Sequence, residues 1–250
     1  MMQNDDALRS QFDEQGYIHI PGFLTETECS AAENHIQSYL TEIAPTLPKT
    51  EVMYDDYDRP ETLKRISRLQ LDPFFEELRS QPKFTDLAQL LLQDEAIAQS
   101  LQYFNKPPQG SATPAHQDGY YFCLVPNEAI TFWIPLDDVD DDNGTLHYVA
   151  GSHKVGILPH KPSSVIGFSQ GLAEADLSQY GEERICVVKR GDVLIHHSRI
   201  IHLAGPNQSD RQRRVLGQVY FAKRAKVDPT MKEQYDSALS AQRKASGLGE

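Results

Sequence analysis

The residues best suited to chemistry are His116 and Asp118, which flank Gln117 in the only His-x-Asp or His-x-Glu sequence of the chain. In a strand, side chains two positions apart point the same way, so the imidazole and the carboxylate would share one face. Together they are two of the three ligands in the two-His, one-carboxylate face of non-heme iron(II) oxygenases. The pair predicts a metal site, although one such tripeptide among nine histidines is a weak signal by itself.

The third ligand has to come from a distant part of the chain. Three histidines, His196, His197 and His202, lie in one predicted strand after the Gly191-Asp192 turn. His202 is favoured because it opens His202-Leu-Ala-Gly-Pro-Asn207, where the strand gives way to a loop. His196 and His197 stay open as alternatives, and are otherwise interpreted as packing or hydrogen-bonding residues beside the site.

A cation for an acidic ligand is expected shortly after His202, where Arg213 opens the next strand. Arginine suits a carboxylate because its planar guanidinium pairs bidentately and keeps its charge. The alternative is that Arg211, Arg213 and Arg214 all lie on a basic surface turn, which we expect of two of the three.

A helical N-terminal layer, predicted over residues 1–98, precedes the segments that carry these residues. Its elements are a helix to about Glu14, a strand over 17–20, a helix from the capping box of Thr25 and Glu28 to about Ile43, and two short helices over 72–80 and 84–93. The segment 45–61, rich in Pro, Tyr and Asp, is predicted as a loop.

From about Gln99 the chain changes to short segments rich in β-branched and aromatic residues, separated by clusters of turn residues. The predicted strands are 99–106, 115–121, 129–136, 144–149, 184–189, 193–202 and 215–222. This spacing predicts an antiparallel double-sheet jelly roll as the core over 99–222, followed by a C-terminal helix over 229–244. Residues 1–250 are therefore predicted to form one domain, mainly β with flanking helices.

Composition argues against several classes of partner. The net charge is −12, and the only dense basic stretch lies over 211–226, so neither nucleic acid nor an anionic membrane surface is expected. No apolar run approaches the roughly 20 residues that span a bilayer, and the acidic N-terminus is not a secretory signal. Three widely spaced cysteines predict reduced thiols. A cytoplasmic location is expected.

The ordered set of motifs resembles the phytanoyl-CoA dioxygenase family, within the superfamily of Fe(II)- and 2-oxoglutarate-dependent oxygenases. The resemblance extends from about residue 12 to residue 222. It rests on Asn105-Lys-Pro-Pro108, His116-Gln-Asp118, Trp133-Ile-Pro-Leu-Asp-Asp138, Asn143-Gly-Thr-Leu146, Ala150-Gly-Ser-His153, Gly191-Asp192, and His202-Leu-Ala-Gly-Pro-Asn207 followed by Arg213. Each motif is weak alone, whereas their order and intervals are specific.

The resemblance implies a double-stranded β-helix, a cupin-like jelly roll, with Fe(II) held by His116, Asp118 and His202. These three are thus the expected metal ligands and catalytic residues. The resemblance also implies 2-oxoglutarate as cosubstrate, with its distal carboxylate paired with Arg213, and ascorbate as an assisting reductant.

Further residues are expected around the cosubstrate by their positions in the resemblance. Gln102 and Trp133 would line its pocket, and either Lys64 or Arg65 would reach it from the N-terminal layer, with Arg65 preferred. The family often has a serine or another small polar group two residues after the distal histidine, where this chain has Ala204. One hydrogen bond to the cosubstrate would therefore be missing or supplied elsewhere.

The implied activity is O2-dependent hydroxylation of a small organic molecule, with release of succinate and CO2. Relatives that halogenate lack the metal carboxylate, so Asp118 favours hydroxylation or a related oxidation. An acyl-CoA substrate would need cations for its phosphates, and the sequence shows no clear cluster beyond the one containing Arg213. Two other classes stay open: a zinc hydrolase with the same ligands, which would turn over without oxygen, and a non-catalytic jelly-roll binding protein.

Overall fold

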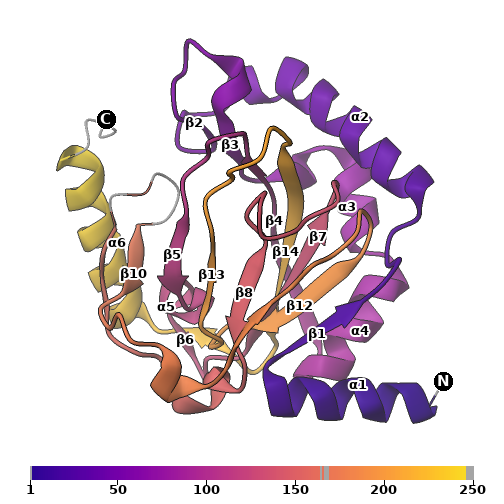
Figure 1. Ribbon diagram of the computed structural model, residues 1–250, viewed down its shortest axis with the longest axis vertical. Helices are drawn as coiled ribbons and strands as arrows, with labels where there is room; N and C mark the ends of the chain where they lie inside the picture. Colours follow the sequence, from indigo (N-terminus) through magenta and orange to yellow (C-terminus); the bar gives the residue numbers. More distant parts are fainter. Residues whose placement is uncertain (1, 164, 166–168, 246–250) are drawn as a thin grey trace.

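Two antiparallel sheets face each other and form the core of the molecule (Figure 1). The computed structural model describes residues 2–163, 165 and 169–245. The larger sheet has the strand order β1-β12-β7-β14-β4-β3-β2, and the smaller sheet has the order β11-β8-β13-β5. From β4 to β14 consecutive strands of the two sheets alternate between them, except for β8 and β11, which pair within the smaller sheet. This is the pattern of a jelly roll, so the predicted fold class is confirmed.

The strands of the larger sheet are β1 Tyr17–Ile20, β2 Val52–Tyr54, β3 Leu63–Ile66, β4 Ala96–Lys106, β7 Ala129–Pro135, β12 Val193–His197 and β14 Arg213–Ala222. Those of the smaller sheet are β5 Thr113–His116, β8 Leu146–Val149, β11 Glu183–Ile185 and β13 His202–Ala204. Two short pairs join β9 His160–Pro162 with β10 Gln170–Leu172, and β6 Leu124–Val125 with β15 Lys226–Val227.

Helices cover the outer face of the larger sheet and one end of the smaller one (Figure 1). They are α1 Met2–Gln15, α2 Glu26–Glu42, α3 Pro73–Arg79, α4 Pro82–Leu92, the short α5 Asp118–Phe122 and the C-terminal α6 Pro229–Ala245. The predicted capping box begins α2: Glu28 N donates to Thr25 Oγ1 at 3.2 Å, and Thr25 N donates to Glu28 Oε2 at 2.8 Å. Among the described residues, no helix is long and apolar enough to cross a membrane.

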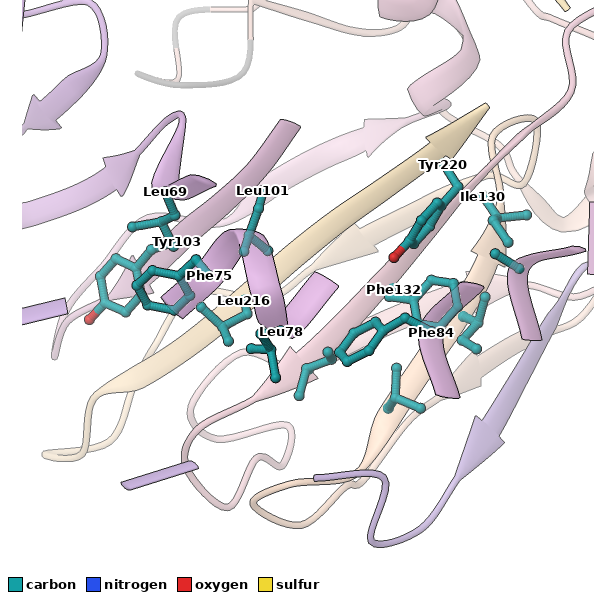
Figure 2. Close-up of a cluster of buried hydrophobic side chains, with 14 of the residues drawn as sticks. Leu69, Phe75, Leu78, Phe84, Leu101, Tyr103, Ile130, Phe132, Leu216 and Tyr220 are labelled. Carbon is teal, nitrogen blue, oxygen red and sulfur yellow. The ribbon is translucent and has the colours of Figure 1, made fainter. Parts of the chain in front are cut away.

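The main hydrophobic core lies between these helices and the larger sheet, as Figure 2 shows. Phe75 and Phe84 from α3 and α4 pack with Leu101, Phe132 and Tyr220 from three adjacent strands. Each of these side chains is almost fully buried, which stabilises the fold by roughly 1.5–3 kcal/mol per side chain. Because side chains alternate along a strand, the opposite face of the same strands is left to build the site.

The N-terminal layer contributes more strand than its helical pattern predicted. Besides β1, the hairpin of β2 and β3 extends the larger sheet beyond β4. The segment 45–61 was predicted as a loop, and its residues Val52–Tyr54 form β2. This hairpin matters for the site, because Arg65 is a register partner of Phe104 and so Lys64 and Arg65 lie beside the core strands.

The strand predicted over 115–121 is wrong beyond its first two residues. β5 ends at His116, and α5 begins at Asp118. The predicted common orientation is nevertheless retained, because Gln117 between them keeps an extended backbone with φ −125° and ψ 123°. The Gln117 side chain points the other way and donates to the carbonyl oxygens of Gly156 at 2.8 Å and Arg199 at 2.6 Å.

The single strand predicted over 193–202 is also wrong. β12 ends at His197 in the larger sheet, and β13 begins at His202 in the smaller sheet. Between them the chain turns, with Ile200 N donating to His197 O at 3.0 Å. Ile200 and Ile201 are fully buried in this connection, so the apolar run that suggested a continuous strand reflects burial between two sheets.

Candidate metal centre

The three predicted ligands meet between the two sheets. His116 at the end of β5 and His202 at the start of β13 are register partners, and Asp118 lies at the N-terminus of α5. Asp118 Oδ1 is 3.6 Å from His116 Nε2 and 3.7 Å from His202 Nε2. Since nitrogen and oxygen ligands lie roughly 2 Å from a first-row metal, these three atoms are close enough to bind one ion.

Backbone carbonyls set the orientation of both imidazole rings. His116 Nδ1 donates to the carbonyl oxygen of Pro114 at 2.8 Å, and His202 Nδ1 donates to that of Ile200 at 3.2 Å. Because a carbonyl oxygen only accepts, the proton resides on Nδ1 and the lone pair on Nε2 is directed at the shared centre. Burial, and next the nearby His116, lower the pKa of His202 well below its usual range, which keeps the ring neutral. The donor set fits a divalent metal.

The carboxylate of Asp118 is fixed through one of its two oxygens. Thr131 Oγ1 on β7 donates to Oδ2 at 2.8 Å, and His196 Nε2 on β12 donates to the same oxygen at 3.2 Å. Tyr148 OH in turn donates to His196 Nδ1 at 2.8 Å, which fixes the tautomer of that ring. Oδ1 therefore faces the two ligand imidazoles, and the arrangement favours coordination through a single oxygen.

The electrostatics of Asp118 agree with a metal-binding carboxylate. Burial alone would raise its pKa, but contacts with His116 and His196 and the nearby His202 outweigh burial. The pKa of Asp118 is consequently held well below its usual range, and the group is ionised at neutral pH. An ionised carboxylate is the protonation state that a metal requires of this ligand.

The two histidines that were alternatives to His202, His196 and His197, lie on opposite faces of β12. His196 faces the centre and contacts Asp118, as described above, while the neighbouring His197 points to the opposite side of β12. The His197 ring lies 6.1 Å from the Phe12 ring and 5.6 Å from the His153 ring, and its Nδ1 accepts from Arg199 N at 3.0 Å. The structure therefore groups His202, and neither alternative, with the other two predicted ligands.

A cavity of about 120 Å³ opens beside these ligands. Its walls include Trp133 and Arg65, as expected of the cosubstrate pocket, together with the alternative Lys64 and the small Ala204. Gln102 is placed differently: by strand alternation it lies on the inner face of β4, but it is not among the described residues that line this cavity. Its side-chain amide donates to Ser100 Oγ at 3.1 Å.

Arg213 is buried in the wall of the cavity, with 6% of its surface exposed. Its guanidinium carbon lies 5.5 Å from the centre of the Trp133 ring, and no carboxylate of the described residues pairs with it. Burial lowers the pKa of Arg213 to about 10, so it stays charged at neutral pH. A buried cation without a countercharge costs several kcal/mol, and an anionic ligand would offset that cost.

The two neighbouring arginines form surface ion pairs, as expected for two of the three. Arg211 Nη2 lies 2.8 Å from Asp140 Oδ2, and Arg214 Nη2 lies 2.6 Å from Asp137 Oδ1. Alternation along the strand separates Arg214 from Arg213, because adjacent side chains point to opposite faces of the sheet.

Two residues of the site were not identified from the sequence. Thr131 donates to Asp118, and Lys106 lies in the cavity wall beside Arg213. A threonine within the apolar run of β7 was the available signal for the first. For Lys106 the signal was a lysine directly before two prolines, at the end of a strand.

Aromatic residues after Asp118 lie beside the metal centre. The Tyr121 ring is 5.7 Å from the His116 ring, and Tyr121 OH donates to the carbonyl oxygen of Gln170 at 2.6 Å. Tyr235 from α6 packs edge-on against both Tyr120 and Tyr121, at ring distances of 6.3 Å and 5.9 Å. The C-terminal helix is thereby connected to α5, the helix that begins with the predicted ligand Asp118 (Figure 1).

Comparisons with known proteins agree with this geometry. The family profile described as Phytanoyl-CoA dioxygenase (PhyH) matches residues 12–215. Phytanoyl-CoA dioxygenase domain-containing protein 1 of Bos taurus is 24% identical over 249 residues, covering 81% of this chain and 85% of that protein. Methylphosphonate hydroxylase of Gimesia maris is 24% identical over 234 residues, covering 92% of this chain and 84% of that protein.

Among solved structures, the fold is similar to that of the epimerase SnoN in complex with Fe3+, alpha ketoglutarate and nogalamycin RO. The TM-score is 0.74 at 23% identity, covering 92% of this chain and 88% of that one. The family profile spans most of the chain, including His116, Asp118, His202 and Arg213. The chain belongs to the phytanoyl-CoA dioxygenase family.

Proposed function

We propose that this protein is an Fe(II)- and 2-oxoglutarate-dependent dioxygenase that hydroxylates a small organic molecule. The observation behind the proposal is that His116, Asp118 and His202 converge beside the buried cation Arg213. Membership of the family makes the chain an enzyme of the 2-oxoglutarate-dependent oxygenase superfamily. Its relatives include a hydroxylase and an epimerase by name, so hydroxylation as the outcome belongs to the proposal.

Each residue of the site has a proposed part. His116, Asp118 and His202 would hold Fe(II), and Arg213 would pair with the distal carboxylate of 2-oxoglutarate. When bound, Fe(II) would supply a site that activates O2, and 2-oxoglutarate would supply two electrons through its oxidative decarboxylation to succinate and CO2, so that one oxygen atom of O2 ends in succinate and the other in the hydroxylated substrate. The chain's own contribution is to orient the ligands, to place a cation at the far end of the cavity, and to exclude water with side chains such as Trp133.

The proposed partners are O2 and a small-molecule substrate. Tyr120, Tyr121 and Tyr235 pack together near the centre and would shape the substrate site. The fold also brings Lys64, Arg65 and Lys106 together with Arg213 around the cavity. This basic cluster is not recognisable in the sequence, because its members lie far apart along the chain. Binding of nucleic acid is not proposed, and the cytoplasmic location stays a prediction.

A succinate-release assay with Fe(II), ascorbate and candidate substrates tests the proposal. His116→Ala should abolish both Fe(II) binding and succinate formation. Arg213→Met should raise the 2-oxoglutarate concentration needed while leaving Fe(II) bound, and Arg211→Met is the matched control, because that side chain is paired with Asp140 on the surface. If succinate formation is the same in all three variants as in the wild type, the assignment is wrong.

The same assay distinguishes the two other classes. A zinc hydrolase would turn over its substrate without oxygen, and a non-catalytic binding protein would never consume 2-oxoglutarate. The buried Arg213 favours the oxygenase over the hydrolase, because hydrolysis at a zinc centre needs no dicarboxylate cosubstrate.

A further inference from the structure

We propose that Lys106 is a second binding residue for the distal carboxylate of 2-oxoglutarate, opposite Arg213; this inference rests on the proposed function. Lys106 ends β4, Arg213 begins β14, and the two are register partners across the antiparallel pair. Their β-carbons are therefore roughly 5 Å apart on one face of the sheet. Both side chains line the cavity, and only 5% of Lys106 and 6% of Arg213 is exposed.

The fold positions the lysine amine closely. Lys106 Nζ donates to the carbonyl oxygen of Gly205, three residues after His202. Two glycines flank the aliphatic stem: a β-carbon at Gly110 would lie 2.7 Å from Cγ, and one at Gly144 would lie 2.9 Å from Cδ and 3.2 Å from Nζ. Any other residue at either position would collide with the stem. In the ammonium form that an anion would stabilise, one N–H is donated to Gly205 and two further donors stay available to the ligand.

The pair of cations lacks a countercharge within the described part of the chain. Lys64, another basic group of the cavity wall, is paired with Asp55 at 2.7 Å, whereas neither Lys106 nor Arg213 has such an ion pair among the described residues. Two like charges placed side by side in a strand pair repel each other, and burial strengthens the repulsion. A carboxylate offers one oxygen to each cation and removes the conflict.

The protonation of Lys106 also supports an anionic ligand beside it. Burial, and then the charges of Arg213 and Lys64, lower the pKa of Lys106 to about 6. The surroundings thus disfavour the ammonium form until an anion is present. Because Lys106 faces Arg213, it lies with it at the end of the cavity assigned to the distal carboxylate, which favours the cosubstrate over a substrate as the source of the anion.

Calorimetric titration of the Fe(II)-loaded protein under anaerobic conditions tests this inference without turnover. The ligands are 2-oxoglutarate and 2-oxopentanoate, which has the same carbon chain but ends in a methyl group. Lys106→Met should weaken 2-oxoglutarate binding on the order of 10- to 100-fold, as expected for loss of a hydrogen bond between charged groups. Binding of 2-oxopentanoate should change less than about twofold. Lys223→Met, at an exposed lysine paired with Glu95, is the matched control and should change neither.

Each other result overturns the inference. Equal weakening for both 2-oxo acids would mean that Lys106 only supports the fold, and unfolding curves of Lys106→Met and Lys106→Gln would show the same loss. An unchanged affinity for 2-oxoglutarate with a raised KM for substrate would assign Lys106 to the substrate instead. If the wild-type protein binds neither 2-oxo acid, the proposed function fails as well, which separates that case from failure of the Lys106 assignment alone.

Discussion

Thr131→Val tests whether the hydrogen bonds to Asp118 Oδ2 set the affinity for the metal. The substitution keeps the shape of the side chain and removes the hydroxyl that donates to Oδ2 at 2.8 Å. His196 still donates to the same oxygen at 3.2 Å, so the carboxylate loses one of two constraints. With the hydroxyl gone the carboxylate is able to rotate, and metal binding must then order it again.

The magnitude follows from the strength of that bond. A hydrogen bond to a charged group contributes roughly 1.5–3 kcal/mol, and each 1.4 kcal/mol corresponds to a factor of ten in affinity. Because His196 continues to hold Oδ2, we expect the lower end, about tenfold weaker Fe(II) binding. Loss of outer hydrogen-bond partners of metal ligands generally costs about 10- to 100-fold in affinity. Replacing His196 with Leu as well should weaken binding further, toward 100-fold.

The assay is competition for Fe(II) between the protein and a chromophoric chelator under anaerobic conditions. Thr113→Val is the control, because Thr113 lines the same cavity from β5 while the hydroxyl that holds the carboxylate belongs to Thr131. Thermal unfolding of the metal-free proteins separates a change in affinity from a change in stability. The reasoning is refuted if Thr131→Val changes the Fe(II) affinity less than twofold, or if Thr113→Val weakens it equally.

Three further predictions concern the charged groups. Arg213→Met should raise the dissociation constant of 2-oxoglutarate at least about 100-fold at unchanged Fe(II) affinity, because removing one partner of a buried ion pair costs roughly 3–5 kcal/mol. Titrations with 2-oxoglutarate and with Fe(II) check this. Burial, as the main cause, lowers the pKa of Lys106 to about 6, so binding of a carboxylate at pH 7.5 should be accompanied by uptake of part of a proton. Calorimetry in buffers of different ionisation enthalpy measures this uptake, and a binding enthalpy that does not depend on the buffer would contradict the prediction. Burial, and then the charge of Arg199, lower the pKa of His197 to about 3. The folded state therefore binds this proton only at a lower pH than the unfolded state does. The free energy of unfolding should fall by up to about 1.4 kcal/mol per pH unit as the pH drops from about 6.5 toward 3. His197→Leu should lose that part of the slope in denaturant unfolding.

Local patterns in the sequence predicted those parts of the molecule that depend on neighbouring residues. The capping box of Thr25 and Glu28 begins α2 as expected, because both of its bonds form within four residues. The shared orientation of His116 and Asp118 needed only an extended residue between them. The motif that begins with His202 was predicted to end a strand, whereas His202 begins β13, and the strand ends within the motif at Ala204, before the turn residues Gly and Pro.

The parts that the sequence did not reveal depend on contacts between distant strands. The break between His197 and His202 is hidden because both sides of it are buried, and apolar residues at 200 and 201 look like a continuing strand. Lys106 is recognised as part of the site only through its register with Arg213. Thr131 likewise gains its importance from its contact with Asp118, which begins α5, just after β5 of the smaller sheet. No local pattern specifies such pairings, because the pairing of strands that are distant in the sequence is decided by packing.

The anchoring of Asp118 by strands of the larger sheet links the candidate metal centre to the helical layer. Asp118 follows a strand of the smaller sheet, yet its outer oxygen is anchored by Thr131 and His196 of the larger sheet. The neighbour of Thr131, Phe132, points outward into the helical layer and packs on Phe84 of α4 at a ring distance of 5.7 Å. The apolar layer under α4 is therefore connected through β7 to the carboxylate, and we expect substitutions there to change the affinity for iron without altering the residues that line the cavity.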